Sequence, residues 1–562
     1  MGAMTDSRPQ RLGPAAAWQP LVLAAALGLL HAASFAPWGY WWVQLAVLSA
    51  FAVLVQSMIR AGRSPRLVGL AGTAFGFAWF VAGVGWLFVS MHTYGLMPAP
   101  LALLALVLFA LYLGLFPGGA AWATAVLCRS RPEGQGLPAA WFALIFAAAF
   151  TLAELLRGHL FTGFPWLAVG YAQTDGPLSG FAALAGSYGV GFVACLVAAL
   201  LAGVLPGLRD GRPRNRLFVR CLLPVAALLV AGQAAKQIAW SHPSGDPLNV
   251  RLLQGNVPQQ MKFDPLVTRQ TMHRYLELVE AEPAGLIVLP ETAWTVPWAA
   301  TPPELAARLE RFVRSTGSAV ALGLPLRTAA ASSGSFGSSG SSGSGNAAPP
   351  ELALTNSVLL FDRAVFEAGA APARYDKRHL VPFGEFVPWG FRWFVDLMTI
   401  PLGDFRRGGF DQAPFAVGSQ RIAFNICYED VFGEELLPAL AGEDGATILA
   451  NVSNIAWFGD SHALPQHLQI ARMRTLETAR PMIRATNTGV TAAIDFDGRL
   501  LGALPPYQLG ALSVSIQGRS GLTPYARAGN WTVVAISLLI LLAAALPTLP
   551  LAAGGKPAKI PR

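Results

Sequence analysis

The feature that most constrains this chain is a series of apolar runs, each long enough to cross a bilayer. A helix needs about 20 residues to cross a hydrocarbon core about 30 Å thick. Eight such runs occur, at residues 18–36, 38–58, 67–91, 98–128, 138–157, 179–205, 217–240 and 529–551. The run at 98–128 is long enough to be tilted, or broken at Pro117, Gly118 and Gly119. The sequence therefore predicts a multi-pass α-helical membrane bundle with eight spans.

Composition supports a membrane protein. Hydrophobic residues make up 54% of the chain and charged residues only 13%, whereas soluble domains have about 45–50% and about 25%. Too few charged side chains are present to cover a water-soluble surface. The first span also has signal-peptide features, because Arg8 and Arg11 precede it and small residues end it. We favour a retained span because further spans follow directly.

The distribution of basic residues predicts the orientation. The short loops around residue 37, at 92–97 and at 158–178 contain no Lys or Arg. The connections on the other side hold Arg8, Arg11, Arg60, Arg63, Arg66, Arg129, Arg131, Arg209, Arg212, Arg214, Arg216, Lys556, Lys559 and Arg562. By the positive-inside rule, both termini are cytoplasmic and the segment between the last two spans faces outward.

The net charge of +9 therefore reflects topology. No finger, RNP or helix-turn-helix spacing points to a nucleic-acid partner. We expect a multi-pass protein of a bacterial inner membrane. Its predicted divisions are a cytoplasmic segment 1–17, a seven-helix membrane domain 18–240, a periplasmic domain 241–528, an eighth membrane helix 529–551 and a basic tail 552–562.

The outward segment 241–528 has an α/β pattern. Apolar, β-branched runs predict strands at 248–254, 285–290, 318–324, 354–361, 421–427, 446–452 and 482–494. Helical patterns lie between several of them, at 265–282, 302–315, 432–441 and 464–480. Alternating strands and helices favour a sheet covered by helices. The Ser/Gly tract 332–345 cannot contribute to a core and predicts a surface loop.

Three residues of this domain are candidates for chemistry. Cys427 is its one cysteine, in a compartment where cysteines usually pair, so it is either a buried hydrophobe or a reactive thiol. Cys427 and Glu291 both end apolar strands, where active-site groups of α/β sheets gather. Desolvation there should raise the pKa of Glu291 and suit it to remove a proton, although a turn-capping role is the alternative. Lys377 by itself is typical of a solvated charge.

Other polar residues do not form a recognisable catalytic or metal-binding pattern. His462 and His467 are too isolated to form a metal site, and no metal or cofactor is expected. Glu154 and Arg157 share a helix face at the outer end of the fifth span. This pair could bind a lipid headgroup, orient the adjoining loop, or only snorkel to the interface.

Several local motifs carry a resemblance to a known family. They are Gln254–Gln259 (QGNVPQ), Leu289–Ala293 (LPETA), Tyr375–Lys377 (YDK) with Leu380–Glu385 (LVPFGE), Cys427–Glu429 (CYE), and Asn451–Asn454 (NVSN) with Ala456–Asp460 (AWFGD). With these motifs the chain resembles the nitrilase (carbon–nitrogen hydrolase) superfamily and, more narrowly, the apolipoprotein N-acyltransferase family of bacterial lipoprotein maturation. The resemblance implies an αββα sandwich between membrane helices.

The resemblance also implies roles for individual residues. Glu291 matches the general base, Lys377 the oxyanion partner and Cys427 the nucleophile. Supporting positions are matched by Glu385, Tyr428 and Glu429, and substrate-binding positions by Asn356, Trp457, Phe263 and Trp389. Phe263 stands where the family often has Trp, so any role that needs an indole N–H is in doubt.

The reaction implied by the resemblance is acyl transfer in two steps. The acyl chain of a phospholipid, expected to be phosphatidylethanolamine, forms a thioester on Cys427 and then passes to the α-amino group of a lipoprotein's diacylglyceryl-cysteine. Two alternatives stay open: a membrane-anchored carbon–nitrogen hydrolase and a non-catalytic lipoprotein-binding scaffold. Nothing in the sequence requires more than a monomer.

An aromatic segment lies between Lys377 and Cys427. Phe and Trp occur repeatedly from residue 383 to residue 394, in a stretch that otherwise has a loop pattern. Such residues suit the bilayer interface. The segment predicts a mobile arm that covers the site and dips into the outer leaflet, with a packed core segment as the alternative.

Overall fold

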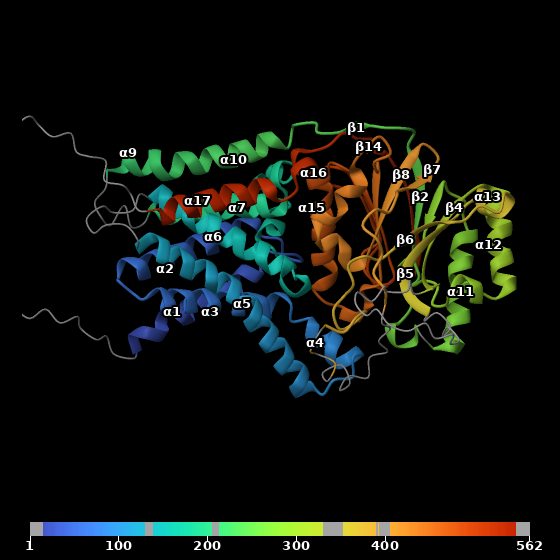
Figure 1. Cartoon of the computed structure of the whole chain (residues 1–562), viewed down its shortest axis with the longest axis horizontal. Coiled ribbons are helices and arrows are strands. Elements are labelled where there is room, and N and C mark those ends of the chain that lie inside the picture. Colours follow the sequence, from blue (N-terminus) through green and yellow to red (C-terminus); the bar gives the residue numbers. More distant parts are fainter. Residues whose placement is uncertain are drawn as a thin grey trace, which may run out of the picture.

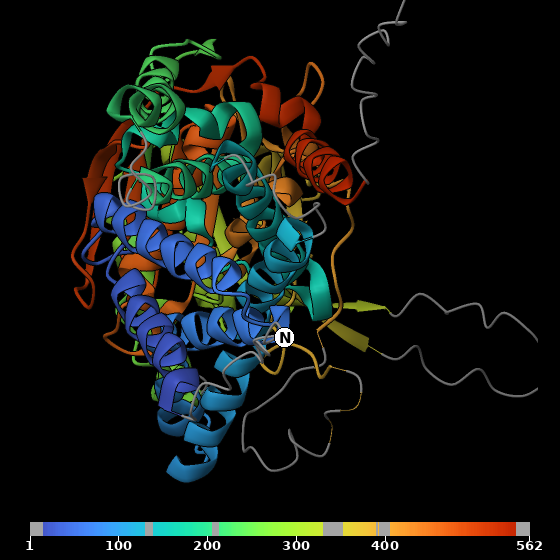
Figure 2. The same ribbon diagram turned by 90° about the vertical axis from the view of Figure 1, so that its left-hand side faces the viewer.

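The computed structural model describes residues 15–129, 139–204, 213–262, 264–329, 352–388, 390, 392 and 405–546. A helical part and a part built of strands and helices lie next to each other along the long axis of the molecule (Figure 1). The last helix, α17, returns to the helical part (Figure 1). Seen from the helical end in Figure 2, the helices lie in front of the strands.

The helical part contains an apolar helix for each predicted span. Six helices of the described ranges are long and apolar enough to cross a membrane, and two shorter apolar helices begin at Trp18 and Trp531. The helices are α1 (Ala15–Ala32), α2 (Trp41–Arg60), α3 (Pro65–Gly83), α5 (Ala99–Arg129), α6 (Ala139–His159), α7 (Ala182–Ala202), α9 with η5 and α10 (Arg214–Ala235), and α17 (Trp531–Ala545). The predicted helical membrane bundle is confirmed.

Two predicted spans differ in detail from the structure. The span expected at 67–91 ends at Gly83, and the chain continues through the short helix α4 (Leu87–Val89) and the π-turn η1 (Ser90–Tyr94). Helix α5 is not broken but continues through Pro117. Proline is tolerated within membrane helices where neighbouring groups satisfy the freed backbone.

Glycines allow α3 and α5 to pack backbone against backbone. A Cβ atom on Gly76 would lie 2.8 Å from the Cα of Gly114, and one on Gly72 would lie 2.6 Å from the carbonyl oxygen of Pro117. Neither contact leaves room for a side chain. Close approach through small residues is a general mode of helix association in membranes, where the hydrophobic effect does not drive helices together.

Two six-stranded sheets form the other part. One has the order β13-β2-β3-β4-β5-β6 and the other the order β12-β11-β10-β9-β8-β7. The central strands of each sheet run parallel. The first sheet consists of β2 (Leu248–Gln254), β3 (Leu286–Val288), β4 (Ala319–Ala329), β5 (Leu352–Phe361), β6 (Ala373–Asp376) and β13 (Gly510–Ile516). The second consists of β7 (Phe415–Val417), β8 (Gln420–Ile426), β9 (Ile448–Ser453), β10 (Met482–Thr486), β11 (Ala492–Ile494) and β12 (Leu500–Ala503).

The sheets pack face to face and helices cover their outer faces. The core between them includes Val250 and Leu252 of β2 with Ile422 and Ile426 of β8. Helices α11 (Pro265–Glu280) and α12 (Pro303–Thr316) cover the first sheet, and α15 (Ala463–Thr478) covers the second on the side of the helical part (Figure 1). The αββα sandwich implied by the family resemblance is confirmed.

Most predicted elements of the sandwich are present with shifted ends. The run predicted as one strand at 482–494 contains two, β10 and β11, which pair antiparallel. The helix predicted at 432–441 is wrong, because the chain forms the 3-10 turns η9 (Gly433–Leu436) and η10 (Pro438–Leu440). Strands β6, β7, β12 and β13 were not predicted. The tract 332–345 lies outside the described residues.

Helix α15 joins the sandwich to the helical part through Gln466. Its Oε1 accepts hydrogen bonds from the indole N–H groups of Trp86, at 3.1 Å, and Trp166, at 2.8 Å. Its Nε2 donates to the carbonyl oxygen of Gly83 at 3.1 Å. The side chain is buried. One amide of the sandwich thus satisfies three polar groups of the helical part.

The pair Glu154 and Arg157 orients the adjoining loop, one of the roles considered for it. Both side chains are buried. Arg157 Nη1 donates to the carbonyl oxygen of Trp166 at 2.9 Å, and Glu154 Oε1 accepts from the N–H of Val169 at 3.0 Å. The loop that carries Trp166 to Gln466 is therefore held by a charge pair on α6.

Replacing Gln466 with Leu should destabilise the folded protein. The substitution leaves two buried indole N–H groups unpaired, at about 1–3 kcal/mol for each. We expect the apparent melting temperature in detergent to fall by at least about 5 °C. Gln270→Leu, at an exposed position of α11, is the matched control and should change it by less than about 2 °C. Equal shifts in the two variants would contradict this assignment.

Candidate active site

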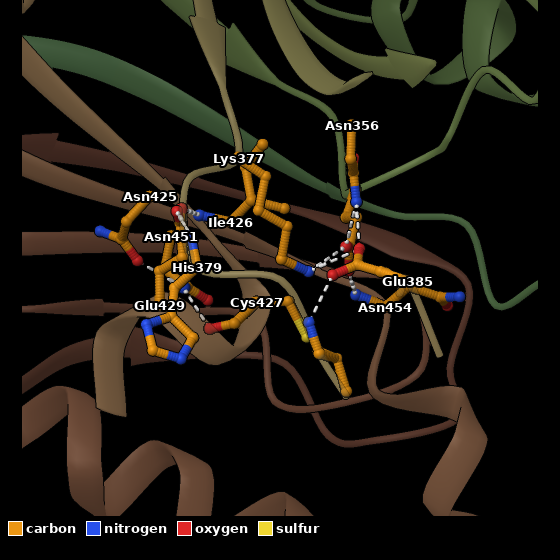
Figure 3. Close-up of polar contacts among 12 residues, drawn as sticks. Asn356, Lys377, His379, Glu385, Asn425, Ile426, Cys427, Glu429, Asn451 and Asn454 are labelled. Atoms are coloured by element: carbon orange, nitrogen blue, oxygen red, sulfur yellow. Dashed lines mark hydrogen bonds and ion pairs between the residues drawn. The ribbon is translucent and has the colours of Figure 1, made fainter. Parts of the chain in front are cut away.

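Three strands end at one place between the two sheets. Glu291 follows β3, Lys377 follows β6, and Cys427 follows β8. The structure brings these three sequence-predicted residues together, and Cys427 lies within electrostatic range of both charged groups. In Figure 3 the side chain of Lys377 extends toward Glu385, with Cys427 nearby. Cys427 and Glu291 belong to different sheets, so the sandwich itself creates the site.

Lys377 is held between two carboxylates. Its Nζ donates to Glu291 Oε1 at 3.1 Å and to Glu385 Oε1 at 2.9 Å, and the side chain is 1% exposed. Asn356 Nδ2 donates to the same two oxygens, at 2.7 and 2.9 Å. Burial by itself would lower the pKa of Lys377, but the two carboxylates outweigh it and raise that pKa well above the ordinary value. Lys377 is therefore a permanent cation.

Glu291 is an ionised carboxylate at neutral pH. Burial opposes ionisation, but the charge of Lys377 and the hydrogen bonds from Asn356 and from the N–H of Asn454 bring its pKa below the ordinary value. The prediction that desolvation would raise the pKa of Glu291 is therefore wrong. The paired cation and the donors exceed the desolvation effect.

Cys427 holds a neutral thiol in the resting site. Burial, and then the charge of Glu291, raise the pKa of the thiol to about 12, against the opposing effects of Lys377 and of the Ser453 hydroxyl beside it. The residue opens the 3-10 turn η8 (Cys427–Val431) with φ 55°. The backbone of a residue other than glycine is strained in this left-handed region. The turn projects the thiol from the strand end.

Glu429 fixes the two loops that carry Cys427 and Lys377. Its Oε2 accepts from the N–H of Ile426 at 2.6 Å and from the Tyr375 hydroxyl at 2.9 Å. Its Oε1 accepts from the N–H groups of Arg378 at 2.6 Å and His379 at 3.1 Å. One buried side chain therefore sets the spacing of both loops (Figure 3).

Tyr428 points away from the sandwich into the helical part. Its hydroxyl donates to the carbonyl oxygen of Gly163 at 3.2 Å, and its ring stacks with that of Trp166 at 6.5 Å between centroids. The residue after Cys427 thus contacts the loop held by Glu154 and Arg157. This contact places the site next to the helices.

The four residues predicted to bind substrate differ in where the structure places them. The side-chain amide nitrogen of Asn356 donates hydrogen bonds to the carboxylates of Glu291 and Glu385. Trp457 is half-buried, with its ring 6.3 Å from that of Tyr94. Phe263 and Trp389 lie outside the described residues. At the start of the aromatic arm, Phe383 packs with Met97 and its neighbours in the helical part.

The structure adds residues that the sequence interpretation missed. Asp430 is a fully buried residue of the turn η8, and it pairs with Arg484 Nη1 at 2.8 Å and with His467 Nε2 at 2.7 Å. Lys262 is also buried, and its Nζ donates to the carbonyl oxygen of Glu291 at 3.1 Å. Lys262 follows the QGNVPQ motif closely in the sequence. That proximity is the one sequence feature that could have pointed to Lys262 as a residue of the site.

No metal-binding arrangement is present in the part of the chain that the structure describes. No group of three or more His, Cys, Asp or Glu side chains is placed to hold an ion there. His467 is used in the pair with Asp430, and His462 packs edge-on against Trp38 at 4.8 Å between ring centroids.

The thiol of Cys427 should react slowly with alkylating reagents in the resting protein. A pKa of about 12 leaves far less thiolate at pH 8 than the ordinary value of about 8.5. We expect iodoacetamide to modify Cys427 at least tenfold more slowly than free cysteine at pH 8, with a rate that still rises above pH 9. Peptide mass mapping, with Cys427→Ala as the control, separates it from Cys128, Cys195 and Cys221. Fast labelling that levels off below pH 8 would contradict the high pKa.

Comparison with known proteins agrees with this architecture. Residues 27–200 match the family model described as the apolipoprotein N-acyltransferase N-terminal domain, and residues 249–525 match the carbon–nitrogen hydrolase model. The chain is 46% identical to the apolipoprotein N-acyltransferase of Ralstonia nicotianae, over 93% of this chain and 92% of that protein. It is 44% identical to that of Bordetella bronchiseptica, over 96% and 98%. The chain therefore belongs to the apolipoprotein N-acyltransferase family.

Proposed function

We propose that this N-acyltransferase works by a two-step mechanism at Glu291, Lys377 and Cys427. An acyl chain moves from a phospholipid, with phosphatidylethanolamine as the expected donor, to the thiol of Cys427. It then moves to the α-amino group of a lipoprotein's N-terminal diacylglyceryl-cysteine. The observation that supports the mechanism best is the convergence of thiol, carboxylate and ammonium at one buried place.

In the first step Glu291 removes the thiol proton as the sulfur attacks the ester carbonyl of the phospholipid. The low pKa of Glu291 and the high pKa of Cys427 mean that no stable thiolate precedes the attack. The proton therefore transfers as the C–S bond forms. Lys377, a fixed cation, stabilises the charge that develops on the carbonyl oxygen. Glu291 then gives the proton to the departing lysophospholipid oxygen.

In the second step the α-amino group of the lipoprotein attacks the thioester carbonyl. An amide bond forms, the C–S bond breaks, and the thiol is restored. A thioester open to bulk water would be lost to hydrolysis, so the site needs a water-poor entrance. The packing of Tyr428 and Phe383 against the helical part supports an entrance from the lipid side.

The surrounding residues have proposed supporting roles. Glu385 and Asn356 hold Lys377 and Glu291 in place, and Glu429 holds the two loops. The carbonyl oxygen of the Asn356 side chain is buried and has no partner among the described residues, so it can accept from a substrate. We propose that Trp457, with Phe263 and Trp389, contacts the lipid.

The acyl-enzyme should be visible by intact mass. After incubation of the purified protein with phosphatidylethanolamine, we expect a mass increase of one acyl group that hydroxylamine removes and that maps to Cys427. Cys427→Ala should give no adduct, and Cys128→Ala should give it at the wild-type level. Glu291→Gln and Lys377→Met should slow adduct formation about 10²- to 10⁴-fold.

The same experiment separates the two other functions considered. A carbon–nitrogen hydrolase would turn over soluble amides rapidly and retain no lipid adduct. A non-catalytic scaffold would support lipoprotein maturation in cells after Cys427→Ala, whereas acyl transfer through the thiol predicts complete loss.

We propose that the chain lies in the inner membrane as a monomer with both termini cytoplasmic and residues 241–528 in the periplasm. This orientation is supported by two basic connections, Arg60–Arg66 and Arg214–Arg216. Both lie on the side of the helices opposite to the sandwich (Figure 1).

Fusions at the C-terminus test the orientation. Green fluorescent protein fused after Arg562 should fluoresce, and alkaline phosphatase at the same place should be inactive. A peptide tag inserted in the tract 332–345 should be accessible to antibody from the periplasm. An active phosphatase fusion at the C-terminus would reverse the proposed topology.

A further inference from the structure

The site contains a second lysine whose surroundings differ from those of Lys377. The Lys262 side chain is 2% exposed, and among the described residues its one hydrogen bond runs from Nζ to the backbone oxygen of Glu291. Lys377 has two carboxylate partners. Lys262 has no carboxylate within ion-pair distance in the described ranges, although the negative charge of Glu291 acts on it. The two amines are therefore placed for different protonation states.

Lysine is rare enough in this chain for its positions to be informative. Among 40 basic residues, lysine stands only at Lys236, Lys262, Lys377, Lys556 and Lys559. Residues 241–528 otherwise use arginine for positive charge. Arginine cannot lose its proton in a protein, whereas a buried lysine readily does. Both lysines of this domain lie in the site, where an amine that releases or accepts a proton has a use.

The second step of the proposed reaction requires an additional proton acceptor. The acceptor amine arrives as an ammonium group and must lose one proton before its nitrogen can attack. It loses another as the amide forms. Glu291 can take the second proton and return it to the sulfur of Cys427. The first proton needs a different base, because Glu291 cannot hold both.

We propose that Lys262, as a neutral amine, accepts the first proton from the α-ammonium group of the lipoprotein substrate. This inference rests on the proposed function. The N–H bond of the ammonium breaks, the proton joins Lys262 Nζ, and the freed amine attacks the thioester on Cys427. When the amide product leaves, Lys262 releases the proton to water, so each turnover liberates one proton and restores every group.

The electrostatics of the site are suited to this role. Burial, only partly opposed by the negative charge of Glu291, lowers the pKa of Lys262 to about 7. An α-ammonium group has a pKa of about 7.7–8.0, so the two differ little and transfer between them is nearly balanced. Lys377 pairs with the carboxylates of Glu291 and Glu385, whereas Lys262 Nζ donates to the backbone oxygen of Glu291. The pKa of Lys262 is lowered and that of Lys377 is raised. When the pKa values of two groups of the same kind are shifted apart in this way, the groups have separate acid–base roles.

Measuring the two steps separately tests the proposal. Lys262→Met removes the base but keeps an unbranched side chain of similar length. We expect its thioester to form within about threefold of the wild-type rate, and transfer to a diacylglyceryl-cysteine peptide to be about 100-fold slower at pH 7. The defect should shrink to within about tenfold at pH 9, where the peptide amine is already neutral. Lys236→Met, at an exposed lysine, should leave both steps unchanged.

Lys262→Arg provides an independent variant that keeps a long basic side chain but is a permanent cation and cannot act as a base. It should form the thioester and show the same slow transfer. In the wild type, the transfer rate should rise with pH through about 7, because Lys262 accepts a proton only above its pKa.

Four outcomes would overturn the assignment. These are an equal loss in both steps for Lys262→Met, a defect that does not depend on pH, normal transfer by Lys262→Arg, and a wild-type transfer rate that is flat between pH 6 and 8. Failure of the proposed function is distinguishable, because in that case the wild-type protein itself would form no thioester.

Discussion

The site depends on a buried cation that is held between two carboxylates. Removing charges from water is costly unless they are paired and hydrogen-bonded. Lys377, Glu291 and Glu385 meet this condition with the help of Asn356. Two carboxylates and one ammonium still leave a negative excess near Cys427. Burial, together with that excess, raises the pKa of the thiol to about 12 and keeps the thiol protonated in the resting site.

A resting site of this kind suits an enzyme that works on lipids. A stable thiolate would react with many electrophiles, whereas in the mechanism we propose the thiol is activated only as it attacks the bound ester. In that mechanism the proton moves among Cys427, Glu291, the leaving oxygen, the incoming amine and Lys262. Because Lys377 does not titrate in this range, it supplies charge stabilisation without entering that exchange.

The helical part and the sandwich form the site together. Gln466 satisfies two tryptophans and a backbone carbonyl of the helical part, and Glu154 with Arg157 holds the loop on which Tyr428 stacks. These contacts are buried and polar, so a shift of one part against the other would leave several groups unpaired. The position of the nucleophile relative to the membrane helices is thereby fixed.

The sequence by itself determined the main elements. Apolar run length set the eight spans, because the bilayer thickness requires it, and β-branched runs located the buried strands. Strands that are mostly only partly buried, β12 and β13 for example, lack such a run and could not be predicted. The glycines that join α3 to α5 are visible in the sequence, but which helices they join is decided by packing.

For the site, local motifs picked out Glu291, Lys377 and Cys427 but not their protonation states. The pKa of Glu291 was predicted in the wrong direction, because its partners Lys377 and Asn356 come from distant segments. Lys262, Asp430, His467 and Arg484 were missed for the same reason. A residue's type and its neighbours along the chain are encoded locally. The charge that a buried group carries depends on groups brought within a few ångströms by folding, and only the tertiary structure decides that.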